Sequence, residues 1–227
     1  MVPSNPFDLQ AWSGVRLDRV EQALSVWVVA HAPAGLGDAM RYAVLDGGKR
    51  LRPLLVMGAS EAVHGNADAA LRAACAVELI HAYSLVHDDL PCMDNDVLRR
   101  GKPTVHVKFG EADALLAGDA LQALAFELLT PDSDEVPTAM QARLCRLLAR
   151  AAGSQGMAGG QAIDLASVGV ALNQTQLREM HRLKTGALLQ GSVEMGAVCH
   201  AGVSPVALAA LRDYGAAIGL AFQVVDD

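Results

Sequence analysis

Segments in which apolar residues recur at helical spacing fill most of this chain and constrain its fold more than any other feature. Short breaks rich in Gly, Pro or Asp separate these segments, and no stretch alternates apolar and polar residues as a half-buried strand would. The pattern predicts one all-α domain over residues 1–227, a large helical bundle. We expect its helices at about residues 15–31, 38–46, 53–64, 67–89, 111–129, 136–153, 155–168, 174–200 and 205–227.

Composition narrows the function classes. A net charge of −7 lacks the basic footprint that non-specific nucleic-acid binding requires, although a few placed cations suffice for a phosphorylated metabolite. Charge, Gly or Pro interrupts the apolar stretches, so we expect no membrane span. The four cysteines form no CxxC pair and no zinc spacing, which favours reduced thiols in a cytoplasmic protein.

The strongest chemical signal is an acidic cluster. The segment HDDLPCMDND places Asp88, Asp89, Asp94 and Asp96 after an apolar helix. Carboxylates this close raise one another's pKa unless they share a cation, and Mg²⁺ is commonly held by one or two carboxylates together with substrate phosphates. A solvated acidic loop and a calcium loop are the alternatives, and the calcium loop fits less well because no EF-hand spacing follows.

Two cationic clusters flank this motif. The segment RRGKP begins at Arg99, where dense positive charge beside dense negative charge suits a phosphate ligand with bound metal. The segment GGKRLRP spans residues 47–53, and Pro53 is expected as the first residue of a helix. Lys49 and Arg52 then lie at a helix N-terminus, which favours an anion. Charge balance on a loop and an ordinary surface turn are the alternatives.

Weaker signals lie on other predicted helices. His81 stands two helical turns before Asp88 on the same face, although a lone helical histidine is more often a core or surface residue. Glu78 and His81 give one Glu-x-x-His pair of the kind that ferritin-like di-metal bundles use, but no second pair follows. The segments GQAID (160–164) and KTG (184–186) add an amide, a carboxylate, a cation and a hydroxyl.

The last residues form a second acidic pair. Gln223, Asp226 and Asp227 share one edge of an apolar helix. Two acidic helix ends that face each other across a bundle would hold several metal ions between them.

Taken in order, the segments GGKRLRP, DDLPCMD, RRGKPT, GQAIDL, KTGALL and FQVVDD resemble the signatures of the trans-prenyl diphosphate synthases, from about Arg41 to Asp227. The resemblance is greatest to the bacterial farnesyl diphosphate synthases. It implies an all-helical fold around a deep central cavity, a homodimer, and a prenyltransferase that joins isopentenyl diphosphate to dimethylallyl or geranyl diphosphate.

The resemblance also implies roles for individual residues. The Mg²⁺ ligands would be Asp88, Asp89, Asp94 and Asp226, and these carboxylates with Arg99 and Lys184 would be catalytic. Isopentenyl diphosphate would be bound by Lys49, Arg52, His81 and Arg100. The allylic diphosphate would face Arg99, Lys184, Thr185 and Gln223.

The reaction implied by the resemblance is ionisation of the allylic diphosphate, condensation and proton loss. Metal and cations would stabilise the departing diphosphate, which would then accept the final proton. This scheme needs no Ser-His-Asp arrangement, and the sequence shows none.

Product length can be argued from steric reach along the helix before Asp88. Tyr83 and Ser84 stand five and four residues before it, and a bulky ring at position 83 would close the floor of the cavity. In the family this arrangement resembles farnesyl-type enzymes, so we expect the C15 product. Geranylgeranyl or geranyl diphosphate is the alternative product, and Tyr83 as ordinary core packing is the alternative role.

The sequence departs from the family pattern at two places. Val97 stands where an acidic residue is usual, at a position that we expect to be peripheral to the metals. The second acidic motif normally continues to another Asp, a Lys-containing loop and further helices. We therefore expect this chain to be truncated at the C-terminus and poorly active by itself.

Two rival functions remain for such a sequence. A non-catalytic, prenyl synthase-like subunit would be expected to have lost motif residues that this chain retains. A terpene cyclase has no need for an isopentenyl site, so Lys49, Arg52 and His81 argue against it.

Overall fold

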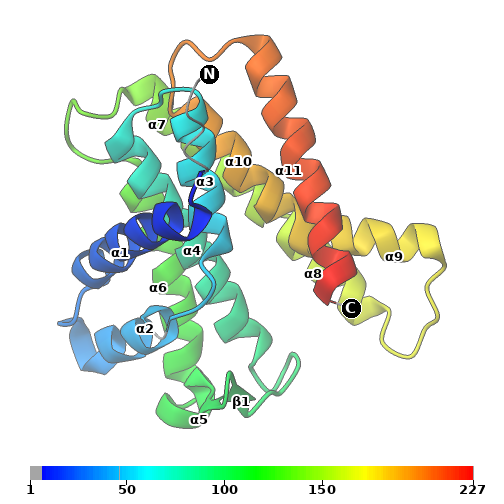
Figure 1. The fold of residues 1–227 in the computed structure, drawn as a ribbon. Helices are drawn as coiled ribbons and strands as arrows, with labels where there is room; N and C mark the ends of the chain where they lie inside the picture. The colour runs from blue at the N-terminus through cyan, green and yellow to red at the C-terminus, as the bar shows by residue number, and fades with distance from the viewer. Residues whose placement is uncertain (1–6, 46, 227) are drawn as a thin grey trace.

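The computed structural model describes residues 7–45 and 47–226, with side chains described as far as residue 222. In order, the elements are α1 (Leu9–Trp27), η1 (Pro33–Gly35), α2 (Leu36–Val44), α3 (Leu51–Ala62), α4 (Ala67–Asp88), β1 (Leu98–Arg99), β2 (Lys102–Pro103), α5 (Val105–Phe109), α6 (Glu111–Leu129), α7 (Thr138–Ala152), α8 (Met157–Ala166), α9 (Gln174–His181), η2 (Arg182–Gly186), α10 (Ala187–Val198) and α11 (Pro205–Asp226). The prediction of an all-α fold is confirmed (Figure 1).

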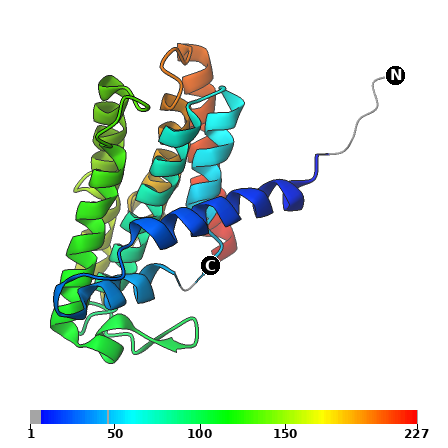
Figure 2. The same cartoon turned by 90° about the vertical axis from the view of Figure 1, so that its left-hand side faces the viewer.

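Helix α4 is the centre of the bundle. Its buried residues include six alanines among larger side chains such as Leu79 and Ile80. The small side chains allow α3, α6 and α10 to approach it closely. The long helices stand side by side in Figure 2, and α1 runs across them. The apolar stretch before Asp88 is therefore core packing along most of its length, and only its C-terminal end reaches the polar motif.

The chain path makes the last helix run parallel to α4. The last turn of α10 meets the start of α4, where the amide of Asn66 donates to the carbonyl of Cys199 at 2.8 Å. After the turn at residues 199–204, α11 packs back along α10. Helices α4 and α11 thus run in the same direction, and both end at the lower side of Figure 1.

Most predicted helices agree with the structure to within two residues at each end, but three predictions need correction. The first helix spans Leu9–Trp27 instead of residues 15–31, and the carboxylate of Asp8 caps its start by accepting from the amide of Ala11 at 2.9 Å. Helix α3 begins at Leu51, so Pro53 is its third residue. That position also tolerates proline, since the first amides of a helix have no intrahelical partner.

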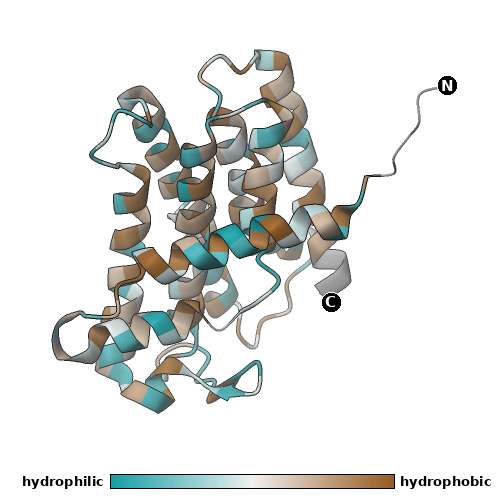
Figure 3. Cartoon of the chain, turned by 60° about the vertical axis from the view of Figure 1, so that its left-hand side comes forward, coloured by the Kyte–Doolittle hydropathy of each residue, from teal (hydrophilic) through white to brown (hydrophobic). Residues whose placement is uncertain are grey.

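The third correction concerns residues 98–109. Both the β1–β2 hairpin and the short helix α5 lie in a segment for which no element was predicted. Hydrophilic residues predominate in the hairpin (Figure 3). Leu98 pairs with Pro103 and Arg99 with Lys102, so the turn residues are Arg100 and Gly101. Both have positive φ, 52° and 78°, as in the type I′ turns that close two-residue hairpins.

The predicted helix over residues 174–200 is continuous but has a π-helical turn inside it. Helix α9, the π turn η2 and α10 follow one another without a break. The π turn is RLKTG, which carries Lys184 and Thr185. Such turns insert one extra residue per turn and are frequent at functional sites.

Two helices meet the length and hydropathy of a membrane span, which corrects the expectation that no stretch is long enough. The apolar window of α4 is 72% buried inside the bundle, which is the mark of a core helix. The window in α11, Pro205–Phe222, is only 11% buried.

Candidate active site

The Asp-rich loop folds back on the end of α4. The amide of Asp94 donates to the carbonyl of Asp88 at 2.8 Å, and the amides of Met93 and Asn95 both donate to Leu90. Asn95 takes a left-handed conformation with φ of 55°, which asparagine tolerates better than most residues. The spacing of the motif therefore places Asp94 beside Asp88.

Asp88 has an environment that opposes its negative charge. Its pKa is raised from the ordinary value of 3.8 to about 6, chiefly by burial and further by Asp94 and Asp89. Lys184 and Arg99 act in the opposite direction. The sequence-based expectation of a raised pKa is confirmed, although burial contributes more than the neighbouring carboxylates.

Asp89, in contrast to Asp88, is held in a direct ion pair. Its side chain is buried, and it accepts from Nε of Arg99 at 3.1 and 3.0 Å and from Nη2 at 2.6 Å. This ion pair raises the pKa of Arg99. The bonds use Nε and Nη2, so Nη1 of Arg99 remains to donate elsewhere. Asp89 thus fixes a cation next to Asp88.

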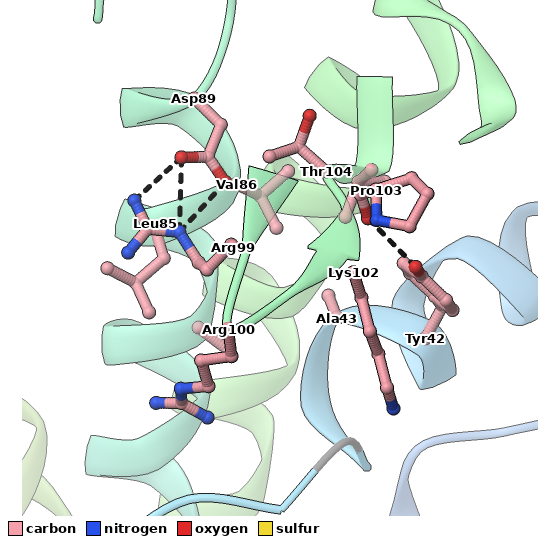
Figure 4. Close-up of a pocket in the computed structure, with 12 residues that line it drawn as sticks. Tyr42, Ala43, Leu85, Val86, Asp89, Arg99, Arg100, Lys102, Pro103 and Thr104 are labelled. Carbon is pink, nitrogen blue, oxygen red and sulfur yellow. Dashed lines mark hydrogen bonds and ion pairs between the residues drawn. The ribbon is translucent and has the colours of Figure 1, made fainter. Parts of the chain in front are cut away.

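A small pocket lies behind this ion pair. Its walls are the end of α4, the hairpin and α2, and Tyr42 closes one side through a 2.8 Å bond to the carbonyl of Pro103 (Figure 4). Its volume of about 60 Å³ is far below the roughly 300 Å³ at which small-molecule sites begin. Figure 4 shows Arg99 turned toward Asp89 and Arg100 turned away from it.

Arg100 reaches the glycine loop before α3. Its Nη1 donates to the carbonyl of Gly47 at 2.8 Å. Gly48 has φ of +137°, a backbone conformation that favours glycine, and its missing Cβ leaves room for the Arg100 guanidinium. The contact docks the loop that carries Lys49, which is exposed, against the hairpin.

Arg52 and His81 form the buried side of this cationic region. Nε of Arg52 is buried, and within the described part of the chain it has no hydrogen-bond partner. Burial lowers the pKa of Arg52. Burial, followed by the charges of Arg52, Arg100 and Arg99, holds the pKa of His81 well below its ordinary value, so its imidazole is neutral at pH 7. A buried guanidinium N–H without a partner, close to other arginines, is a donor that an anion could satisfy.

Arg50, which sequence reasoning gave no role, is the structural member of the same segment. Its guanidinium donates to Glu78 at 2.7 Å, to Glu21 at 2.6 Å and to the carbonyl of Val44 at 2.6 Å. The arginine and Glu78 are nearly inaccessible, with side-chain exposures of 3% and 6%. Because Glu78 is paired with Arg50, it is not available as a metal ligand, which removes the ferritin-like alternative.

Lys184 approaches the site from the π turn η2. Its Nζ donates to Asp164 of α8 at 2.5 Å, and its charge also lowers the pKa of Asp88. Gly160 makes this packing feasible, since a Cβ there would lie 2.1 Å from the backbone nitrogen of Lys184. Nearby in sequence, both amide atoms of Gln161 are buried without a partner in the described residues. Thr185 follows on the same turn and is half-buried.

The remaining predicted residues lie apart or outside the description. Tyr83 is 9% exposed and packs between α4 and α6, while Ser84 is half-buried and donates to the carbonyl of His81 at 2.9 Å. The side chains of Gln223 and Asp226, at the end of α11, lie outside the described residues, as does Asp227 altogether.

No group of three or more His, Cys, Asp or Glu side chains with metal-binding geometry occurs in the described ranges. With Asp89 engaged by Arg99, the available pair is Asp88 and Asp94. Two carboxylates match the way Mg²⁺ is usually held when substrate phosphates complete its shell.

The chain is similar to known proteins over most of its length. The family model "Polyprenyl synthetase" matches residues 33–227. A farnesyl diphosphate synthase from Geobacillus stearothermophilus is 48% identical over 92% of this chain and 70% of its own length. A chloroplastic geranylgeranyl pyrophosphate synthase from Catharanthus roseus is 45% identical over 99% of this chain and 63% of its own length.

Solved structures show the same similarity. An FPP/GFPP synthase from Zymomonas mobilis superposes with a TM-score of 0.89 at 44% identity, covering 96% of this chain and 79% of that one. A geranyltransferase from Legionella pneumophila gives a TM-score of 0.91 at 41% identity, covering 96% and 78%. The chain spans 61–63% of the length of two plant relatives that it matches over nearly all of its own length. The chain belongs to the polyprenyl synthetase family.

Proposed function

We propose that the protein condenses isopentenyl diphosphate with dimethylallyl or geranyl diphosphate and makes farnesyl diphosphate. One observation carries the proposal. A region lined by Arg52, Arg100 and His81, in which the buried Nε of Arg52 has no hydrogen-bond partner among the described residues, adjoins a carboxylate pair faced by cations (Asp88 and Asp94, with Lys184), and Arg99 acts on both. Two adjacent sites of opposite sign suit two diphosphates, only one of which is bound through metal.

The isopentenyl diphosphate would occupy the cationic region. Arg52 and Arg100 are placed to donate to its phosphate oxygens, and the exposed Lys49 would close over it from the glycine loop. His81 is neutral in the free protein because burial and the surrounding arginines lower its pKa, and a neutral imidazole can still donate one N–H to an oxygen. This side requires no metal.

The allylic diphosphate would lie on the carboxylate side, in contact with Lys184, Thr185 and Nη1 of Arg99. Mg²⁺ held by Asp88 and Asp94, with Asp226 proposed as a ligand from α11, would supply the positive charge that stabilises the departing diphosphate. Lys184 is fixed by Asp164 and Arg99 by Asp89, so both cations are oriented before substrate binds. Such preorganised charge is what an ionisation step requires.

The chemistry then needs only orientation and proton removal. The isopentenyl double bond attacks the allylic cation, and the proton lost from the condensed product passes to the released diphosphate. The two diphosphate sites hold the reacting carbons close together, which replaces a bimolecular encounter by a bound geometry.

The C15 product is proposed from Tyr83. Its ring is buried along α4 on the way from Asp88 into the bundle, where a growing chain would meet it. Relatives named as farnesyl and as geranylgeranyl synthases have similar identity to this chain, so the family alone does not select a product. A geranylgeranyl or geranyl diphosphate synthase is the second candidate.

We also propose a homodimer in the cytoplasm. Helix α6 exposes Leu115 and Leu116, which a partner subunit would cover. A relative from Arabidopsis thaliana is named as the large subunit of a heterodimeric synthase, so a heterologous partner is the alternative.

A product assay tests the function. The full-length protein is incubated with Mg²⁺, labelled isopentenyl diphosphate and either allylic starter, and the dephosphorylated alcohols are sized. A C15 alcohol that disappears with EDTA is the expected result. A C20 product would keep the family chemistry and remove the role of Tyr83, whereas no condensation by folded protein would favour the non-catalytic subunit.

A further inference from the structure

His87, the residue before the Asp-rich motif, packs its imidazole ring against α6. Its Nε2 lies 3.0 Å from the carbonyl oxygen of Leu115, and because a carbonyl can only accept, Nε2 carries the proton. One turn on, Gly118 leaves the space that the ring fills. A Cβ at Gly118 would lie 2.1 Å from Nε2 and 2.4 Å from Cδ2 of His87. Any other residue at position 118 would displace the imidazole.

The imidazole of His87 in turn packs against the ring of Tyr83. The two rings are one helical turn apart on α4 and meet edge to face, with centroids 5.6 Å apart and planes at 76°. At its other end, the tyrosine hydroxyl is hydrogen-bonded to the side chain of Gln122. Leu115, Gly118 and Gln122 follow one face of α6 at spacings of three and four residues, so a single face of α6 holds both the histidine and the tyrosine.

We propose that His87 and Gln122 are positioning residues for product length, because together they fix the rotamer of Tyr83. The proposal rests on the proposed function, in which Tyr83 closes the floor of the product cavity. A tyrosine ring is an effective floor only if it cannot rotate away when a longer chain presses on it. The edge contact with His87 and the bond to Gln122 oppose that rotation from two sides.

Ser84, the residue next to Tyr83, has no such hydrogen bond to α6 among the described residues. Its hydroxyl bonds back to the carbonyl of His81 in its own helix at 2.9 Å, so it contributes little bulk beyond the helix surface. The limit on product length therefore depends on the ring at position 83 and on what supports that ring. His87 also directly precedes Asp88, so one short segment fixes both the diphosphate end and the floor of the cavity.

The test measures the ratio of C20 to C15 products with geranyl diphosphate as starter and excess isopentenyl diphosphate. In His87→Ala the ratio should rise at least about tenfold, because a space the size of a few methylene groups discriminates by about that factor or more. Gln122→Leu keeps the bulk of the side chain but removes the bond, and should raise the ratio by a smaller factor. In a Tyr83→Ala background neither change should alter the ratio further.

The outcomes separate this inference from the proposed function. His106→Ala is the matched control, since His106 lies near the same motif but bonds to Thr104 at 3.1 Å, and its ratio should equal that of the wild type. If His87→Ala and Gln122→Leu lose activity but keep the wild-type ratio, the two residues have only a structural role and the inference fails. If the wild-type protein makes no C15 product at all, the proposed function itself fails. Because Gln122 is exposed, its variant should fold even if the His87 variant does not.

Discussion

Arg50 and Arg52 stand two residues apart at the start of α3, and their surroundings are opposite. Arg50 has three hydrogen-bond acceptors, two of them carboxylates, whereas the buried Nε of Arg52 has none among the described residues. Asp89 and Asp88 show the same contrast. Asp89 forms an ion pair with Arg99, whereas burial raises the pKa of Asp88. The paired member of each couple builds the scaffold, and the unpaired member is left for a ligand.

The largest expected effect tests the acidic couple. Asp88→Asn should lower kcat at least about a thousandfold, because it removes one of the two carboxylates proposed to hold Mg²⁺. The same change should stabilise the metal-free protein by about 1–3 kcal/mol above pH 6. The sign follows from the folded pKa of about 6, above the ordinary 3.8, which makes the ionised form costly in the folded state.

Chemical denaturation at several pH values, with EDTA, measures this gain. The stability difference between Asp88→Asn and wild type should shrink as pH falls from 6 to below 3.8, where the wild-type carboxyl becomes protonated in both the folded and the unfolded state. Asp89→Asn is the matched control and should lose stability, because Arg99 loses its partner. A destabilised Asp88→Asn protein would break the contrast between the two aspartates.

The second prediction compares the two arginines directly. Arg50→Met should cost about 3–5 kcal/mol of unfolding free energy, because it leaves the carboxylate of Glu78 buried without its closest partner. Arg52→Met should leave stability unchanged or raise it, since it removes a buried N–H that has no hydrogen-bond partner among the described residues. If urea unfolding shows equal losses of unfolding free energy for both variants, the two arginines contribute equally to stability and the contrast between them fails.

The third and smallest expected effect is a change in the pKa of His81 on ligand binding. It tests the cationic region around His81 without a mutation. Burial and the nearby arginines depress its pKa, and a bound diphosphate would offset those positive charges. NMR titration of the imidazole should therefore show a higher pKa when isopentenyl diphosphate is bound. The signals of His64, at the far end of α3, are the internal control and should not respond to the ligand.

Sequence reasoning succeeded where local pattern decides structure. The helix over residues 111–129 has the predicted bounds, and α4 begins where Asn66 caps it. The pairing of Asp88 with Asp94 also follows from short-range spacing. Patterns of this kind need no knowledge of distant contacts.

What could not be predicted depends on contacts between segments far apart in sequence. The roles of Arg50 and Arg52 in the segment RLR are distinguished only by Glu21 and Glu78, which lie on other helices. The position of the His87 ring depends on the space at Gly118 of α6, and the hydrogen bond that fixes Lys184 is accepted by Asp164 of α8. The hairpin was missed because its strands are two residues long, too short to show alternation.

The central claim is that the unpaired cations form the isopentenyl diphosphate site. Calorimetric titration of isopentenyl diphosphate into wild type, Arg52→Met and Asp88→Asn tests it most directly, with Arg212→Met as a surface control because Arg212 pairs with Glu194 at 2.8 Å. The account predicts affinity about thirtyfold weaker or more in Arg52→Met, from the loss of charge-assisted bonds, and near wild-type affinity in Asp88→Asn and Arg212→Met. Unchanged affinity in Arg52→Met, with binding lost in Asp88→Asn, would contradict it.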